Sequence, residues 1–139
     1  MFRGRRNVTL VDSNVLIDIF TTSPAWFAWS MEWLDRQSHR GPLYFDEIVY
    51  AELAVKSESE AELDRALADL GLQLYPIPKN ALFLAGKVFG HYRRAGGTRS
   101  SALPDFFIGA HAQVTGLPLL PRDVGRYRTY FPKVKLIAP

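Results

Sequence analysis

The chain has 139 residues, 47% of them hydrophobic and 22% charged, a balance that predicts one compact domain spanning 1–139. It contains no cysteine, which excludes disulfides, thiolate nucleophiles and the common cysteine-based zinc sites. Apolar stretches fall well short of the ~18 residues of a membrane-spanning helix, and the basic start MFRGRR is not followed by the apolar h-region of a secretory signal. We therefore expect a cytoplasmic protein without membrane spans, whose net charge of +3 is compatible with an anionic partner.

Short apolar runs alternate with helical patterns along the whole chain. Strands are predicted, in chain order, at 8–11, 43–45, 72–75, 117–120 and 134–137. Helices are predicted from residue 13 onward and over about 24–38, 46–55, 59–70, 81–92, 104–116 and 125–131. Pro24 and Pro104 favour helix starts, and Ser59 opens a capping box. Because parallel strands need crossover connections, the alternation predicts an α/β fold, a three-layer α/β/α arrangement around a mainly parallel sheet.

Most of the fourteen acidic residues have an ordinary explanation. Five lie on the polar side of one amphipathic helix, where a solvated face accounts for them: Glu58, Glu60, Glu62, Asp64 and Asp69. Asp46 and Glu47 fall at a helix start, where negative charge complements the helix dipole. Four acids are embedded in apolar sequence and form the candidate site: Asp12, Glu52, Asp105 and Asp123.

The positions of these four acids predict a shared cation. Asp12 and Asp123 follow the C-terminal ends of predicted strands, the edge at which open α/β sheets bind ligands. Asp105 lies in a first helical turn, where a helix-start role explains it equally well, and Glu52 lies in mid-helix. Carboxylates that meet raise each other's pKa or recruit a cation, and oxygen ligands select Mg²⁺ or Mn²⁺ over zinc.

The other polar residues give weaker indications. The histidines show no metal-ligand spacing, so we expect ordinary surface or packing roles for His39, His91 and His111. Four arginines are candidate phosphate contacts because they flank a glycine-containing loop or precede the last aspartate: Arg93, Arg94, Arg99 and Arg122. A solvated tail is expected to hold Arg3, Arg5 and Arg6. Phosphate-loop, dinucleotide-binding and serine-hydrolase motifs do not occur.

Expectations also follow for Asp18, for one polar loop and for the tryptophan-rich helix. Asp18 lies one helical turn after Asn14 and is expected to serve the local structure. The polar loop 98–102 is the best candidate for a mobile segment. The helix over 24–38 is crowded with tryptophans, and any that remain exposed would mark a protein contact.

Four segments together resemble PIN-domain proteins of the VapC-like type, the toxin halves of bacterial toxin-antitoxin pairs: VDSNVLIDI, the isolated glutamate of YAEL, PDFFIGAHAQVTGLPLLPRD and RYRTYFPKVKLI. The resemblance covers essentially the whole chain and implies a metal-dependent ribonuclease with an α/β/α fold. Its acidic cluster corresponds to Asp12, Glu52, Asp105 and Asp123, and its orienting polar residue to Asn14. It also implies an RNA substrate, a small antitoxin that neutralises the protein, and a homodimer.

The resemblance also implies roles for the acids. Asp12, Asp105 and Asp123 would contact Mg²⁺ or Mn²⁺ directly or through water, and Glu52 would orient the attacking water or complete the metal shell. The chain departs from the family at Pro121, where a hydroxyl residue is common and a hydrogen bond around the metal ligands is lost or made by a neighbour. Ser13 replaces the usual threonine and keeps its hydroxyl.

Two other functions are compatible with parts of this pattern. One is an interaction module that keeps the fold, has lost catalytic turnover and acts through the tryptophan-rich helix. Pro121 favours this interpretation. The other is a receiver-like phosphoacceptor, which also uses clustered acids and Mg²⁺. That second alternative expects a lysine on a late strand-end loop, whereas Arg122 precedes Asp123 here and no lysine is well placed.

Overall fold

The computed structural model describes residues 8–99 and 102–138. Its elements, in chain order, are β1 (Thr9–Val11), α1 (Ser13–Phe20), α2 (Phe27–Arg40), β2 (Leu43–Phe45), α3 (Glu47–Ala54), α4 (Glu60–Asp69), β3 (Leu72–Leu74), α5 (Lys79–Arg94), α6 (Leu103–Thr115), β4 (Leu119–Leu120) and α7 (Gly125–Tyr130). The predicted solvated arginines Arg3, Arg5 and Arg6, and residues 100–101 of the predicted mobile loop, lie outside the described residues. Within the described ranges, no helix is long and apolar enough to cross a membrane.

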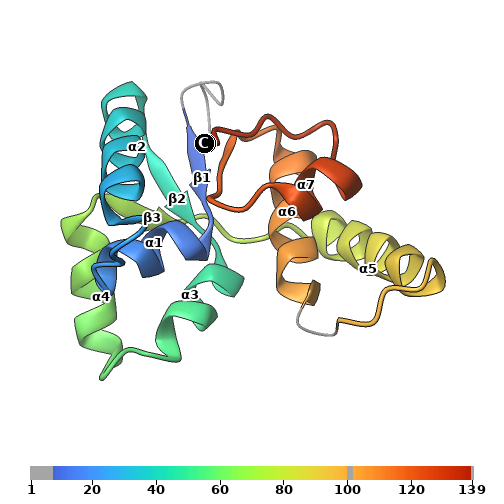
Figure 1. Cartoon of the computed structure of the whole chain (residues 1–139), viewed down its shortest axis with the longest axis horizontal. Helices are drawn as coiled ribbons and strands as arrows, with labels where there is room; N and C mark the ends of the chain where they lie inside the picture. Colours follow the sequence, from blue (N-terminus) through green and yellow to red (C-terminus); the bar gives the residue numbers. More distant parts are fainter. Residues whose placement is uncertain (1–7, 100–101, 139) are drawn as a thin grey trace.

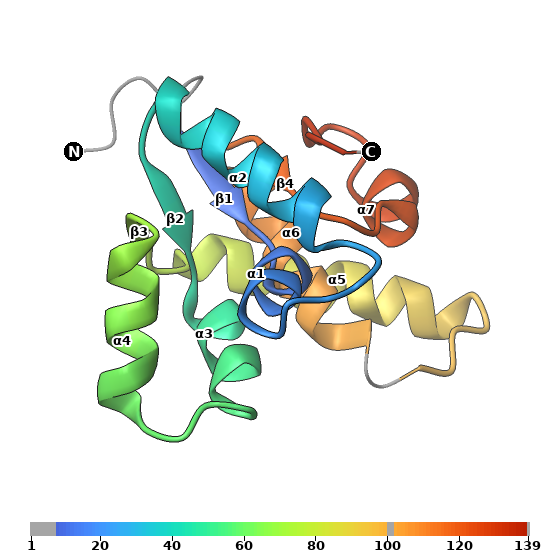
Figure 2. The ribbon, with the colours of Figure 1, turned by 60° about the vertical axis from the view of Figure 1, so that its left-hand side comes forward.

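The four strands form one parallel sheet in the order β3-β2-β1-β4. The crossovers β1 to β2 and β2 to β3 step in one direction, and the crossover from β3 to β4 returns in the other. Right-handed crossovers therefore place the connecting helices on opposite faces. Figure 1 shows α1 to α4 gathered on one side and α5 to α7 on the other, and in Figure 2 α2 crosses in front of β1 while α6 lies behind. The predicted three-layer α/β/α fold is confirmed.

The direction of the crossovers reverses between the neighbouring strands β1 and β4. The chain leaves β1 toward α1 on one face and leaves β4 toward α7, which packs against α6 on the other face. A crevice forms at such a switch point, at the C-terminal ends of the strands. Asp12 and Asp123 both follow these ends, so the topology brings them to one edge of the sheet.

Most predicted elements are confirmed, with two corrections. The segment 134–137 is not a strand, because it makes only an isolated bridge between Leu119 and Leu136. Pro118 and Pro121 flank β4 and lack the N–H that a longer ladder needs, so only two residues remain for pairing. The helix predicted from Pro24 begins instead at Phe27, because residues 24–26 form a turn.

Capping residues account for the N-terminal ends of α3 and α4. The Ser59 hydroxyl accepts a hydrogen bond from the Glu62 N–H at 3.1 Å and caps α4, as the capping box predicts. Asp46 caps α3, accepting a hydrogen bond from the Val49 N–H at 3.0 Å.

An aromatic cluster joins α5, α6 and α7. The Phe106 ring contacts four other rings, those of Phe89, Tyr92, Tyr130 and Phe131. This packing holds α5, α6 and α7 together.

Candidate active site

Asp12 is the most deeply buried of the four candidate carboxylates, with 2% of its surface exposed. One carboxylate oxygen accepts the Ser13 N–H at 2.7 Å, and the other accepts the Tyr127 hydroxyl at 2.8 Å. Burial raises the pKa of Asp12 from 3.8 to about 7, with the charges of Asp105 and Glu52 adding to the rise and the two hydrogen bonds opposing it. Asp12 therefore carries a charge that the surrounding protein only partly compensates.

Glu52 approaches Asp12 from α3. Its Oε1 accepts a hydrogen bond from the Ser13 hydroxyl at 2.8 Å, and the same hydroxyl lies 3.4 Å from Asp12 Oδ1. Since one hydroxyl has a single hydrogen to donate, the shorter contact identifies Glu52 as its acceptor. Partial burial raises the pKa of Glu52, and the charges of Asp105 and Asp46 raise it further. Ser13 thus positions Glu52 beside the end of β1.

Asp105 lies in the first turn of α6 and makes an ion pair with the guanidinium of Arg126 in α7. No sequence motif predicted this contact of Arg126, which lies 21 residues from Asp105 in the chain. Burial raises the pKa of Asp105 and the charge of Asp123 adds to this, whereas the hydrogen bond and charge of Arg126 lower it. Asp105 is therefore a half-buried carboxylate shared between an acidic cluster and one internal cation.

Asp123 is exposed and defines the turn from β4 into α7. Its Oδ1 accepts a hydrogen bond from the Gly125 N–H at 3.3 Å. The preceding backbone is held by Asn14, whose Oδ1 accepts the Arg122 N–H at 3.2 Å. Asn14 therefore ties the loop that carries Asp123 to the first turn of α1.

The four predicted acids form one electrostatically connected group. The pKa of Asp12, Glu52 and Asp105 is in each case raised by the charge of at least one other member of the group. For Asp105 that member is Asp123. Carboxylates whose negative charge is not fully compensated supply the oxygen ligands that a hard divalent cation prefers. As the side chains lie, however, no three His, Asp or Glu groups among the described residues are arranged to hold a metal ion. Instead, Tyr127 and Arg126 occupy one oxygen of Asp12 and one of Asp105.

Arg122, a predicted phosphate contact, has internal partners. Its Nε and Nη2 donate to the two carboxylate oxygens of Asp18 at 2.7 and 3.2 Å, and its guanidinium lies 5.2 Å from the Trp26 ring centroid. The Ser30 hydroxyl donates to the same Asp18 at 3.0 Å. Asp18 therefore joins α1, α2 and the loop after β4, a role that extends beyond the local structure expected from the sequence. In the sequence, the only sign that Asp18 would be buried is its position among the apolar residues of α1.

The other predicted phosphate contacts are exposed near the end of α5: Arg93, Arg94 and Arg99. The Arg93 guanidinium lies 5.9 Å from the Phe89 ring centroid. The Arg99 backbone N–H donates to the Tyr92 hydroxyl at 3.2 Å, which anchors the start of the following loop. No contact joins these arginines to the four acids within the described ranges, so their phosphate role stays a prediction.

His111 is completely buried and has an acidic partner that no local sequence pattern predicts. Its Nδ1 lies 2.9 Å from Asp46 Oδ2, and both side chains are fully buried. Asp46 therefore does more than cap α3: it joins α3, which carries Glu52, to α6, which carries Asp105. The Tyr75 ring packs edge-on against the imidazole at 5.0 Å between centroids. The expected packing role for His111 is correct, but its buried pairing with an acid 65 residues away was not foreseen.

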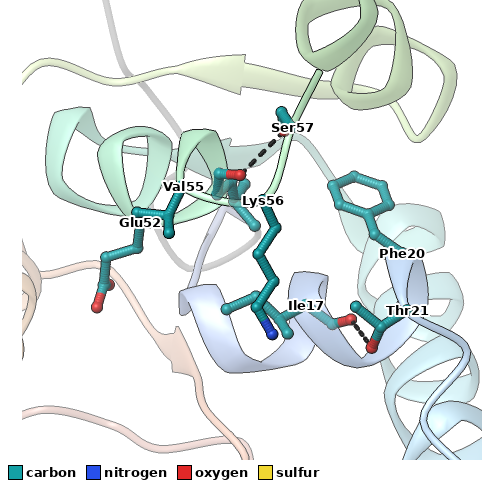
Figure 3. Close-up of a pocket in the computed structure, with 8 residues that line it drawn as sticks. Ile17, Phe20, Thr21, Glu52, Val55, Lys56 and Ser57 are labelled. Carbon is teal, nitrogen blue, oxygen red and sulfur yellow. Dashed lines mark hydrogen bonds between the residues drawn. The ribbon is translucent and has the colours of Figure 1, made fainter. Parts of the chain in front are cut away.

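An apolar pocket of about 310 Å³ lies beside the acidic group, between the C-terminal ends of α1 and α3. Figure 3 shows Glu52 at one side of this pocket and Phe20 at the other. Its lining residues are Ile17, Phe20, Thr21, Glu52, Leu53, Val55, Lys56 and Ser57. Phe20 and Val55 are notably exposed for apolar residues, at 38% and 81%. The acidic group therefore borders an open apolar surface.

Several solved structures have a similar fold, among them a toxin-antitoxin complex from Klebsiella pneumoniae, which gives a TM-score of 0.64 at 22% identity with coverages of 91% and 94%. A chain of VapBC2 from Rickettsia felis bound to a DNA fragment from its promoter aligns with a TM-score of 0.69 at 17% identity, covering 95% of this chain and 98% of that chain. VapBC-1 from nontypeable Haemophilus influenzae gives a TM-score of 0.69 at 17% identity, with coverages of 94% and 97%. FitAcB from Neisseria gonorrhoeae gives 0.61 at 18% identity, with coverages of 92% and 95%. At these identities the likeness concerns the fold.

Sequence comparison supplies the family. No curated protein matches the sequence. The family model described as "PIN domain" matches residues 9–132, a range that includes all four candidate acids and the two α7 residues that contact them. Since this match covers most of the chain, the protein belongs to the PIN-domain family.

Proposed function

We propose that the protein is a Mg²⁺- or Mn²⁺-dependent endoribonuclease that acts in the cytoplasm as the toxin of a toxin-antitoxin pair. The observation that carries this proposal is the linked group of Asp12, Glu52, Asp105 and Asp123 at the switch point of a PIN-domain sheet. Carboxylates that act on one another's charge, three of them with raised pKa values, favour a divalent cation.

The residues around the group have distinct roles in this proposal. Asp12, Asp105 and Asp123 would hold the cation, which when bound supplies an activated water and neutralises charge on the leaving oxygen. Glu52, whose carboxylate accepts a hydrogen bond from the Ser13 hydroxyl, would orient the attacking water or complete the cation's ligands. Asn14 keeps the Asp123 loop in place through its hydrogen bond to the Arg122 backbone.

Asp105→Asn is expected to lower the rate of RNA cleavage by more than about 100-fold, because even groups behind the metal ligands contribute 10- to 100-fold. The measurement is the cleavage of structured RNA by the purified chain, free of any partner, with Mg²⁺ or Mn²⁺. Asp69→Asn, which neutralises an exposed carboxylate of α4, is the matched control and should cleave like the wild type. Equal cleavage by wild type and Asp105→Asn would exclude the proposed role of Asp105.

The toxin role adds two partners to the proposal. The structural neighbours are complexes with antitoxins, and the apolar pocket beside Glu52 suits an apolar segment followed by a basic side chain that reaches the acids. We therefore infer a small antitoxin that covers this pocket. A homodimer is also part of the proposal, supported by the exposed Leu82 and Phe83 on α5, and sedimentation of the purified chain tests it.

Expression of the wild-type chain without a partner is expected to slow bacterial growth, and Asp12→Ala is expected to remove the effect. Mapping the ends of cellular RNA after induction of the two proteins identifies the substrate. Growth that is unaffected by the wild type, together with the lack of a short reading frame beside its gene, would argue against the toxin role.

An interaction module without turnover is the second candidate. Pro121 is buried beside the acids and supplies neither a hydroxyl nor an N–H. On α2 and at its N-terminal end, half-buried Trp26, Trp29 and Trp33 form a row with successive ring centroids 6.0 and 6.2 Å apart. This candidate predicts no RNA cleavage by the wild type, and binding of a protein partner that is lost on substitution of a tryptophan.

A further inference from the structure

Arg126 is a feature of the acidic group that the proposed function does not use. Its guanidinium contacts Asp105 Oδ2, and the two side chains are 25% and 32% exposed. Among the ion pairs of the described residues, this is the only one that includes any of the four candidate acids. Arg126 is therefore the internal cation of the acidic group.

The backbone of Arg126 is held firmly on both sides. The Asp123 carboxylate accepts the N–H of Gly125, the first residue of α7, and Tyr127 is buried with its hydroxyl donating to Asp12. Consecutive residues of a helix point about 100° apart, so Arg126 and Tyr127 reach different carboxylates. The long guanidinium side chain can consequently change partner without a movement of α7.

The two α7 contacts differ in what they mean for a cation. The hydroxyl of Tyr127 is neutral, and its pKa is raised well above the ordinary range by burial and by the neighbouring carboxylates. Its bond to Asp12 therefore adds no positive charge to the group. Arg126 is always charged, and it both occupies an oxygen of Asp105 and repels a second cation nearby.

We propose that Arg126 is an exchangeable counter-ion that holds Asp105 while no divalent cation is bound and must release this carboxylate before a cation takes it. The proposal rests on the assignment of Asp105 to the cation site in the proposed function. Arg126 is thus a positioning residue, which weakens cation binding and keeps Asp105 in place in the cation-free protein.

Calorimetric titration of the full chain with Mn²⁺ alone tests the exchange. Arg126→Gln is expected to bind Mn²⁺ about tenfold more tightly than the wild type, which corresponds to about 1.4 kcal/mol. Arg126→Lys keeps the charge and should bind Mn²⁺ with nearly wild-type affinity. Arg128→Gln removes the same charge from an exposed position of α7 and should also leave the affinity unchanged. Cooperative thermal unfolding verifies that each variant is folded.

A titration of the wild type with Mg²⁺ provides a second measurement that needs no variant to fold. The side-chain Nε–H resonance of Arg126 should shift with saturation as the ion pair opens, while that of Arg128 stays in place. Affinity that is unchanged or weaker in Arg126→Gln, binding by neither protein, or an unmoved Arg126 resonance would overturn the proposal. These titrations contain no RNA, so failure of the nuclease proposal is seen separately, as absence of cleavage by the wild type.

Discussion

Asp12→Asn is expected to make the cation-free protein more stable at pH 7.5, by up to roughly 4 kcal/mol. Burial raises the pKa of Asp12 from 3.8 to about 7. Between these values the folded protein retains a proton that the unfolded chain has lost, so the free energy of unfolding falls as the pH rises from about 4 to about 7. Asparagine avoids this loss, because its amide can accept the Ser13 N–H and donate to the Tyr127 oxygen.

Urea unfolding in the presence of a chelator, at pH values from 5 to 8, measures this effect. The wild type should lose stability across the range, whereas Asp12→Asn should change much less. Asp69→Asn serves as the control, because its carboxylate is exposed and its removal should leave the wild-type pH dependence in place. If the two curves for wild type and Asp12→Asn were parallel, the burial cost assigned to Asp12 would be wrong. Mg²⁺ should restore stability to the wild type alone.

His111→Ala is expected to destabilise the protein by about 3–5 kcal/mol. The substitution leaves Asp46 Oδ2 fully buried without its partner at 2.9 Å, and it opens a cavity beside Tyr75. The free energy of unfolding from urea titration is the measurement. Because Asp46 and His111 join α3 to α6, loosening them should also displace Glu52 relative to Asp105 and lower Mn²⁺ affinity.

Two variants separate the buried pair from general effects of losing a histidine. His91→Ala, at an exposed position of α5, should change stability by no more than about 0.5 kcal/mol. Asp46→Asn keeps an acceptor for the Val49 N–H and a polar partner for the imidazole, so it should cost less than His111→Ala. A cost below about 1 kcal/mol for His111→Ala would show that the pair does not stabilise the contact between α3 and α6.

Local sequence was sufficient for most elements and for the acids of the candidate site. Hydrophobic periodicity and capping residues are short-range properties, so helices such as α4, with its Ser59 cap, follow directly from a few neighbouring residues. Asp12 and Asp123 could be placed at one sheet edge because they follow strands that the alternation of elements makes parallel. The segment 134–137 has the composition of a strand but does not form one. Strand pairing also depends on the neighbouring strand, and β4 has only two residues between its flanking prolines.

The partners of the buried charges were decided by the tertiary structure. Asp12 meets Tyr127 across 115 residues, Asp18 meets Arg122 across 104, and nothing local in either member predicts the other. Such pairs depend on which crossover passes over which face and on the angle at which α7 returns to α6. By itself, therefore, the sequence determined that a carboxylate follows the end of each of β1 and β4. Only the folded chain decided that α7 supplies a hydroxyl to one of them and a guanidinium to another, because side-chain contacts between distant segments are fixed by packing.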